Sequence, residues 1–212
     1  TGNETQTYID GTRVRNPFGA TIPDLGSRGR FNPFIFKGTI FSTGGYSALY
    51  GQALSSAVIL STIDLPEKSS ANASLSSVGL GGGYQHLSKN KKQSFGINYN
   101  YTNLGTYFKL IKQNVDFITP PKSHQVDANY RIKVGKTGMF KFYGYVNGTR
   151  TGIRRQNITS LDYEDENKEY KDEYSVKNNN AYGNFSYKQF LGNKWQLKAG
   201  YSISYFMLAV KS

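Results

Sequence analysis

The chain of 212 residues contains no cysteine, which excludes a disulfide framework and any metal site built from thiolates. Histidine is also scarce. His86 and His124 are the only two, and neither has a second ligand at metal-binding spacing, so we assign them no metal or catalytic role. No apolar run approaches the roughly 18 to 20 residues of a membrane-spanning helix. The sequence therefore predicts neither a metalloprotein nor a helical membrane protein.

Patterns typical of enzymes are missing too. No Ser-His-Asp order, nucleophile elbow or paired-carboxylate motif stands out, so we expect no enzymatic activity and no cofactor. Gly79–Gly83, GLGGG, lacks the lysine and the following helix of a phosphate-binding loop, and glycines in a hairpin are the favoured interpretation. The acidic run Asp162–Glu173 lacks the spacing of an EF-hand, which favours a solvated loop over a calcium site.

Negative charge is in short supply, because 26 Lys and Arg residues face 14 Asp and Glu residues and the net charge is +12. A clustered excess of this size would indicate nucleic acid or anionic lipid as a partner. The basic residues are instead spread over expected turns and strand ends, as in Lys89–Lys92 and Lys133–Lys136. We therefore expect no binding of nucleic acid.

Strand-forming residues are what the chain has in abundance. Its 17 Tyr and 13 Phe residues stand among Asn, Ser, Gly and Thr, a mixture that predicts an all-β protein. From Ser94 onward apolar and polar residues alternate with period two, which indicates strands with two different faces. A hydrophobic fraction of 37% does not exclude a transmembrane barrel, because such a barrel exposes only every second residue to lipid.

The length of the alternating segments helps to decide whether lipid or water surrounds them. They are near or above the ten or so residues that cross a bilayer at a tilt, and their tyrosines lie where an aromatic ring suits the lipid–water boundary. Their polar faces carry Asn, Ser, Thr and Gly, as a barrel lumen does. These features favour a barrel over a soluble β-sandwich, which alternates as well.

Two motifs near the N-terminus carry a resemblance to a known family. Tyr8–Val14 reads YIDGTRV, a strand that ends in Asp-Gly, and Arg30–Asp64 holds two β-prone runs at 34–41 and 56–63 around the turn Gly44-Gly45. Within the second motif, GGYSALYGQALSS followed by VILSTID resembles the end of the plug domain of TonB-dependent outer-membrane receptors of Bacteroidetes-type bacteria. YIDGTRV is similar to the plug strand that precedes this element.

The resemblance implies a division of the chain and a function. Residues 1–66 would be the C-terminal part of a plug domain, and residues 67–212 the first strands of an antiparallel transmembrane β-barrel. The protein would lie in the outer membrane of a Gram-negative bacterium, in contact with its lipid, and import a scarce nutrient by plug rearrangement. The nutrient stays open among an iron chelate, cobalamin, a glycan and a peptide. A TonB-type complex would supply energy through a segment absent from this chain, and a surface lipoprotein is a further possible partner.

Barrels of this family close with twenty-two strands, so the chain is expected to be a fragment. We predict seven strands, at 71–77, 80–87, 93–110, 123–134, 139–154, 180–190 and 195–209. The turns 88–92, 135–138 and 191–194 are short, whereas the loops 112–122 and 156–178 are long and polar. Outer-membrane barrels have short periplasmic turns. The resemblance also implies that the first barrel strand starts on the periplasmic side, below the plug, and with that start only two strands within 70–87 put the three short turns on the periplasmic side.

Five residues are candidates for contact with the ligand or between plug and barrel: Arg28, Arg30, Phe31, Tyr46 and Tyr50. In the family, apical plug loops touch the ligand and plug arginines pair with carboxylates of the barrel wall. Pairing is the favoured role for Arg28 and Arg30.

Two other functions stay open at this point. A plugged barrel could serve as a structural or accessory subunit of a larger envelope complex, because fold does not fix function. A soluble basic β-sandwich that binds polyanions is the third alternative.

Overall fold

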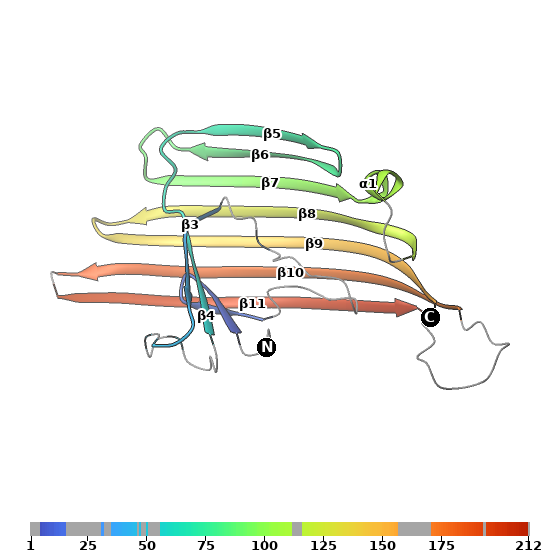
Figure 1. Ribbon diagram of the computed structural model, residues 1–212. Helices are drawn as coiled ribbons and strands as arrows, with labels where there is room; N and C mark the ends of the chain where they lie inside the picture. The colour runs from blue at the N-terminus through green and yellow to red at the C-terminus, as the bar shows by residue number, and fades with distance from the viewer. Residues whose placement is uncertain are drawn as a thin grey trace.

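The computed structural model describes residues 5–15, 31, 35–45, 47, 50, 56–111, 116–156, 171–192 and 194–211. Their secondary structure is strand apart from one short helix, which confirms the all-β prediction. They form two sheets, a four-stranded one with the order β2-β1-β4-β3 and a seven-stranded one with the order β11-β10-β9-β8-β7-β6-β5 (Figure 1). We call them the small sheet and the large sheet.

The large sheet is an antiparallel meander in which each strand pairs with its neighbours in sequence. Its strands are β5 (Ser70–Ser76), β6 (Gly79–Leu87), β7 (Gln93–Asn103), β8 (Asp116–Val134), β9 (Gly138–Gln156), β10 (Lys171–Leu191) and β11 (Trp195–Lys211). The four strands from β8 to β11 are 17 to 21 residues long. β5 and β11 form the two edges, so the described strands make an open sheet.

The short connections of the large sheet share one end, as predicted. The short connections at residues 88–92, 135–137 and 192–194 lie at one end of the large sheet (Figure 1), which we call the short-turn end. Residues 70–87 hold two strands, as predicted, with their turn at Ser77-Val78 on the opposite end. Gly135 and Gly192 adopt φ of +61° and +67°, which glycine tolerates without steric cost.

One predicted strand is wrong over its second half. The strand expected at 93–110 ends at Asn103, and Gly105–Leu110 form the helix α1. Asn103 causes the change, because its side-chain Oδ1 accepts a hydrogen bond from the Gly105 amide at 3.0 Å. A short polar side chain that bonds the backbone two residues on starts a turn and competes with the strand ladder.

The two long polar loops are also shorter than predicted. β8 begins at Asp116, and the Pro120-Pro121 pair lies inside it, where register shifts between Phe117 and Lys122 accommodate residues that cannot donate to the ladder. β10 begins at Lys171, where polar residues pair with the end of β9. Residues 157–170 lie outside the described part of the chain.

The small sheet consists of β1 (Thr5–Ile9), β2 (Thr12–Val14), β3 (Phe36–Ser42) and β4 (Ser56–Thr62). β1 and β2 form a hairpin at Asp10-Gly11, both with positive φ, and the Asp-Gly sequence suits that turn. β1 also pairs in parallel with β4, which is antiparallel to β3. The strands expected from both N-terminal motifs are therefore confirmed.

The large sheet has one apolar and one polar face. Strand register joins Ile97, Ala128, Gly144, Gly183 and Ile203 into one transverse row, and Ile97 and Ile203 are 52% and 57% exposed. The neighbouring row lies on the opposite face and contains Asn98, Asp127, Tyr145, Tyr182 and Ser204. We call the first face the outer face and the second the inner face.

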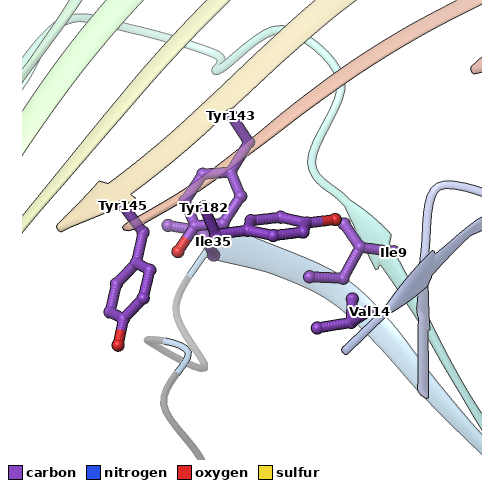
Figure 2. Packing of buried hydrophobic residues seen from close by; sticks show 6 residues of the cluster. All are labelled: Ile9, Val14, Ile35, Tyr143, Tyr145 and Tyr182. Atoms are coloured by element: carbon purple, nitrogen blue, oxygen red, sulfur yellow. The ribbon is translucent and has the colours of Figure 1, made fainter. Parts of the chain in front are cut away.

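The small sheet lies across the inner face, with its strands running across those of the large sheet (Figure 1). Ile9, Val14 and Ile35 pack there against three tyrosines of β9 and β10, namely Tyr143, Tyr145 and Tyr182 (Figure 2). The described residues bury eight hydrophobic side chains and leave 28 large ones exposed. The fold thus covers the polar face of its main sheet and leaves the apolar face open.

Gly200 allows a close approach of the two sheets, and it gives a test of their packing. A Cβ atom at this position of β11 would lie 2.5 Å from Thr12 Cγ2 of the small sheet. We expect Gly200→Ala to lower the free energy of unfolding by about 1 to 3 kcal/mol through overpacking. Gly82→Ala is the matched control, because its Cβ would meet nothing nearer than 3.4 Å. Equal losses in denaturant titrations of both variants would contradict the close approach.

Candidate functional site

A lysine on the inner face links the two sheets electrostatically. Lys141 of β9 places its Nζ 2.7 Å from Asp64 Oδ1 and 4.0 Å from Asp10 Oδ1, and donates to the Thr62 carbonyl oxygen at 3.0 Å. The side chains of Lys141 and Asp10 are only 13% and 11% exposed. We call these four residues the Lys141 cluster.

Both carboxylates of the Lys141 cluster have further donors. Asp10 accepts a hydrogen bond from the Thr62 amide at 2.9 Å and another from the Thr62 hydroxyl, so the β1–β2 turn is tied to the end of β4. Asp64 accepts a hydrogen bond from Lys37 Nζ of β3 at 2.8 Å. On the large sheet, the buried Arg131 lies directly opposite Lys141 and adds positive charge near both carboxylates.

The ionisation of Asp64 makes this contact sensitive to acid. Burial raises the pKa of the carboxyl, but hydrogen bonds from Lys141 and Lys37, with their charges, outweigh this and lower the pKa to about 2 from 3.8. Since the folded pKa lies below the unfolded one, the stabilisation is complete above the unfolded pKa and is lost as pH falls toward 2. We expect Asp64→Asn to lose less stability than the wild type between pH 4 and 2, roughly the window these pKa values define. Thermal unfolding across that window is the measurement, and parallel acid profiles would refute the assignment.

A second group of contacts holds the β1–β2 hairpin against β10 and β11. Asn184 Nδ2 donates to the Ile9 carbonyl at 3.3 Å and to the Thr12 hydroxyl, and that hydroxyl donates to the Ile9 carbonyl at 2.9 Å. Ser202 Oγ donates to the Arg13 carbonyl at 3.1 Å. Asn184 Nδ2 and Ser202 Oγ of the inner face are thus satisfied by backbone carbonyls of the small sheet.

Two of the five predicted site residues lie in the described part of the chain. The Phe31 ring packs against the large sheet, because its centroid is 5.6 to 6.2 Å from the ring centroids of Tyr182, Tyr145 and Tyr143. Tyr50 makes an edge contact with Tyr8 at 5.0 Å. Arg28, Arg30 and Tyr46 lie outside the described residues.

A cavity of about 340 Å³ separates the two sheets beside the Lys141 cluster. Lys37, Tyr50, Ile59 and Asp64 line it from the side of the small sheet, and Lys141, Lys188 and Lys198 from that of the large sheet. Lys188 and Lys198 lie near the ends of β10 and β11, which places the cavity at the short-turn end.

Sequence reasoning missed the lysines of this cavity. Lys141, Lys188 and Lys198 stand at inner-face positions of alternating strands, where the pattern distinguishes a polar residue from an apolar one but does not tell what it faces. Lys141 lies 79 residues from its partner Thr62, and no local signal joins them. A lysine among the Ser, Asn and Gly of the polar positions was the only available hint.

No family model matches the chain, and no curated protein does. The residues that the structure describes include no group of three or more His, Asp or Glu side chains arranged to hold a metal ion. Among those same residues, none of the helical structure is long and apolar enough to cross a membrane.

Proposed function

We propose that the chain forms the end of the plug domain and the first barrel strands of a TonB-dependent outer-membrane receptor that imports a scarce nutrient. The single observation that carries the proposal is the exposed apolar outer face of the large sheet, opposite a polar inner face that the small sheet covers. In water, burial of apolar surface is the main stabilising term, so a soluble fold would cover the apolar face first. Lipid is a solvent that favours the observed arrangement.

The outer face fits a bilayer in its composition as well as in its exposure. Ile97, Val126, Val146 and Ile203 are exposed there, and so are Tyr84 and Tyr99, which are paired with Ile97 and Val126. Exposed aliphatic and aromatic side chains on one face are typical of the lipid side of transmembrane strands. The long strands from β8 to β11 exceed the span of about ten residues that a tilted strand needs.

In this proposal the small sheet is part of the plug and the large sheet is part of the wall. Ligand binding shifts the population of plug positions, and force from the TonB-type complex then breaks contacts between plug and wall. The Lys141 cluster and the hydrogen bonds of Asn184 and Ser202 are such contacts. The barrel closes with strands beyond β5 and β11, and energy comes from the partner complex rather than from catalysis in this chain.

Fractionation of cells that make the protein tests the proposal, with gel mobility before and after heating as the readout. A receptor is expected in the outer-membrane fraction, extracted only by detergent, with a compact band that shifts on boiling. Recovery of a monodisperse protein without detergent would refute it and favour the basic β-sandwich.

A second experiment separates the receptor from an accessory subunit of the same fold. A strain that lacks the gene is expected to grow poorly when the transported nutrient is limiting, in a panel of iron chelates, cobalamin, glycans and peptides. Normal growth on every member of the panel, together with loss of a larger envelope complex, would favour the accessory role.

A further inference from the structure

The cavity at the short-turn end carries an excess of positive charge. Lys188 of β10 and Lys198 of β11 are directly opposite each other in the strand register and line the same cavity. Like charges at directly opposed cross-strand positions destabilise a sheet. Such a pair is therefore a feature that the fold alone does not explain.

The carboxylates of the cavity are already engaged. Asp64 binds Lys141 and Lys37, and Asp10 accepts hydrogen bonds from Thr62. Among the described residues no carboxylate pairs with Lys188 or Lys198, and Lys188 makes only a cation–π contact, 5.0 Å from the centroid of Phe190. Four lysines and two aspartates thus leave a local excess of two positive charges.

The surroundings strengthen this field. The turns and strand ends at residues 88–92, 133–138 and 188–198 contain eight lysines, including Lys188 and Lys198 themselves, and no acidic residue. These residues gather at the short-turn end, where the cavity lies. Clustered charge of one sign around a recess raises the local concentration of ligands of the opposite sign.

We propose that this cavity binds a phosphate group carried by a small soluble compound. Two ammonium groups on neighbouring strands present up to six N–H donors to the oxygens of one doubly charged phosphate, and lysine binds phosphate as a point charge. Both lysines belong to the inner face, away from the apolar outer face, so the phosphate reaches them from water rather than from a lipid headgroup. The inference does not rest on the transport function.

The bound phosphate has a structural consequence. The cavity is lined by Lys37 of the small sheet together with Lys188 and Lys198 of the large sheet. A phosphate held there offsets the repulsion between the opposed lysines and adds a contact between the two sheets. A ligand that binds only the folded state also raises its stability in proportion to the logarithm of ligand concentration.

Thermal unfolding of the detergent-purified protein in inorganic phosphate, against chloride at equal ionic strength, tests the proposal. We expect a saturable rise in the unfolding temperature, and at least a tenfold weaker apparent affinity in the Lys188→Gln/Lys198→Gln double variant. Lys136→Gln, on the β8–β9 turn, is the matched control and is expected to change the affinity less than twofold. Removing two like charges is expected to preserve folding, and the heat-shifted gel band checks this.

Four outcomes would overturn the proposal. The first two are a rise in unfolding temperature that chloride reproduces and an apparent affinity for phosphate that is equal in the double variant and the wild type. The third is a loss of phosphate affinity in Lys136→Gln as large as that in the double variant. The fourth is a double variant that keeps its phosphate affinity but loses binding to phosphatidylglycerol vesicles. If the double variant does not fold, Lys198→Gln alone replaces it with the same expectation. If the protein is found soluble and still binds phosphate, the receptor proposal is overturned but the phosphate site in the cavity is not.

Discussion

Replacement of Ile203 by lysine is expected to cost the folded protein about 2 to 4 kcal/mol in a lipid bilayer, the range for a basic residue at the midplane of a barrel's lipid face. Ile203 lies midway along β11 on the outer face, where its side chain is exposed. In a bilayer a charge there would have no water and no partner among the neighbouring residues of its row, Gly183, Gly144 and Ala128. Denaturant titration in phospholipid vesicles measures the loss.

Ser204→Lys is the matched control for this change. Ser204 lies one position along the same strand, but on the inner face opposite Tyr182, and is also exposed. A lysine on that face points into water in a barrel and is expected to change stability by less than about 0.5 kcal/mol. If both variants unfold like the wild type in vesicles, lipid is not the solvent of the outer face.

Lys141→Met is expected to destabilise the contact between the sheets by about 1 to 3 kcal/mol, because it removes the cation that pairs with the half-exposed Asp64 at 2.7 Å and lies 4.0 Å from the buried Asp10. Methionine keeps most of the volume of lysine, so the loss reports the ammonium group rather than a cavity. Asp10 would retain its hydrogen bonds from Thr62 but lose the nearest cation of the large sheet. Hydrogen exchange of the amides of β1 and β4 measures the weakened docking.

Lys133→Met supplies the control, since Lys133 also lies on the large sheet but is exposed and in no described ion pair. The double variant Lys141→Met/Asp64→Asn is expected to lose less than the sum of the two single changes, because both remove the same interaction. Additive losses, or equally protected amides in Lys141→Met and the wild type, would show that the cluster does not hold the sheets together.

The period-two pattern explains why so much of the fold was predictable. It depends only on neighbouring residues, so Ile97 and Asn98 identify two faces of one strand without knowledge of the rest of the chain. The ends of the strands were harder to predict, because β8 and β10 continue into polar residues whose conformation is fixed by their pairing partners. The turn at Asn103 depends on one side-chain hydrogen bond, which the alternation does not register.

The candidate site depends on information of another kind. Phe31 was predicted from its place between two expected strands, and its ring lies beside three tyrosines of the large sheet. The Lys141 cluster requires the crossing of two sheets, and the Lys188–Lys198 pair requires an exact strand register. Both are tertiary properties that a one-residue shift of register would abolish.

The pairing of β1 with β4 has a consequence for the order in which the molecule folds. The large sheet grows from hairpins between sequence neighbours, whereas β1 and β4 meet across a separation of 51 residues, and the Asn184–Ile9 contact spans 175. Contacts between distant residues pay a greater loop-closure entropy and form late. We therefore expect the meander to assemble hairpin by hairpin as the chain emerges, and the small sheet to dock last, onto a polar surface that is already complete.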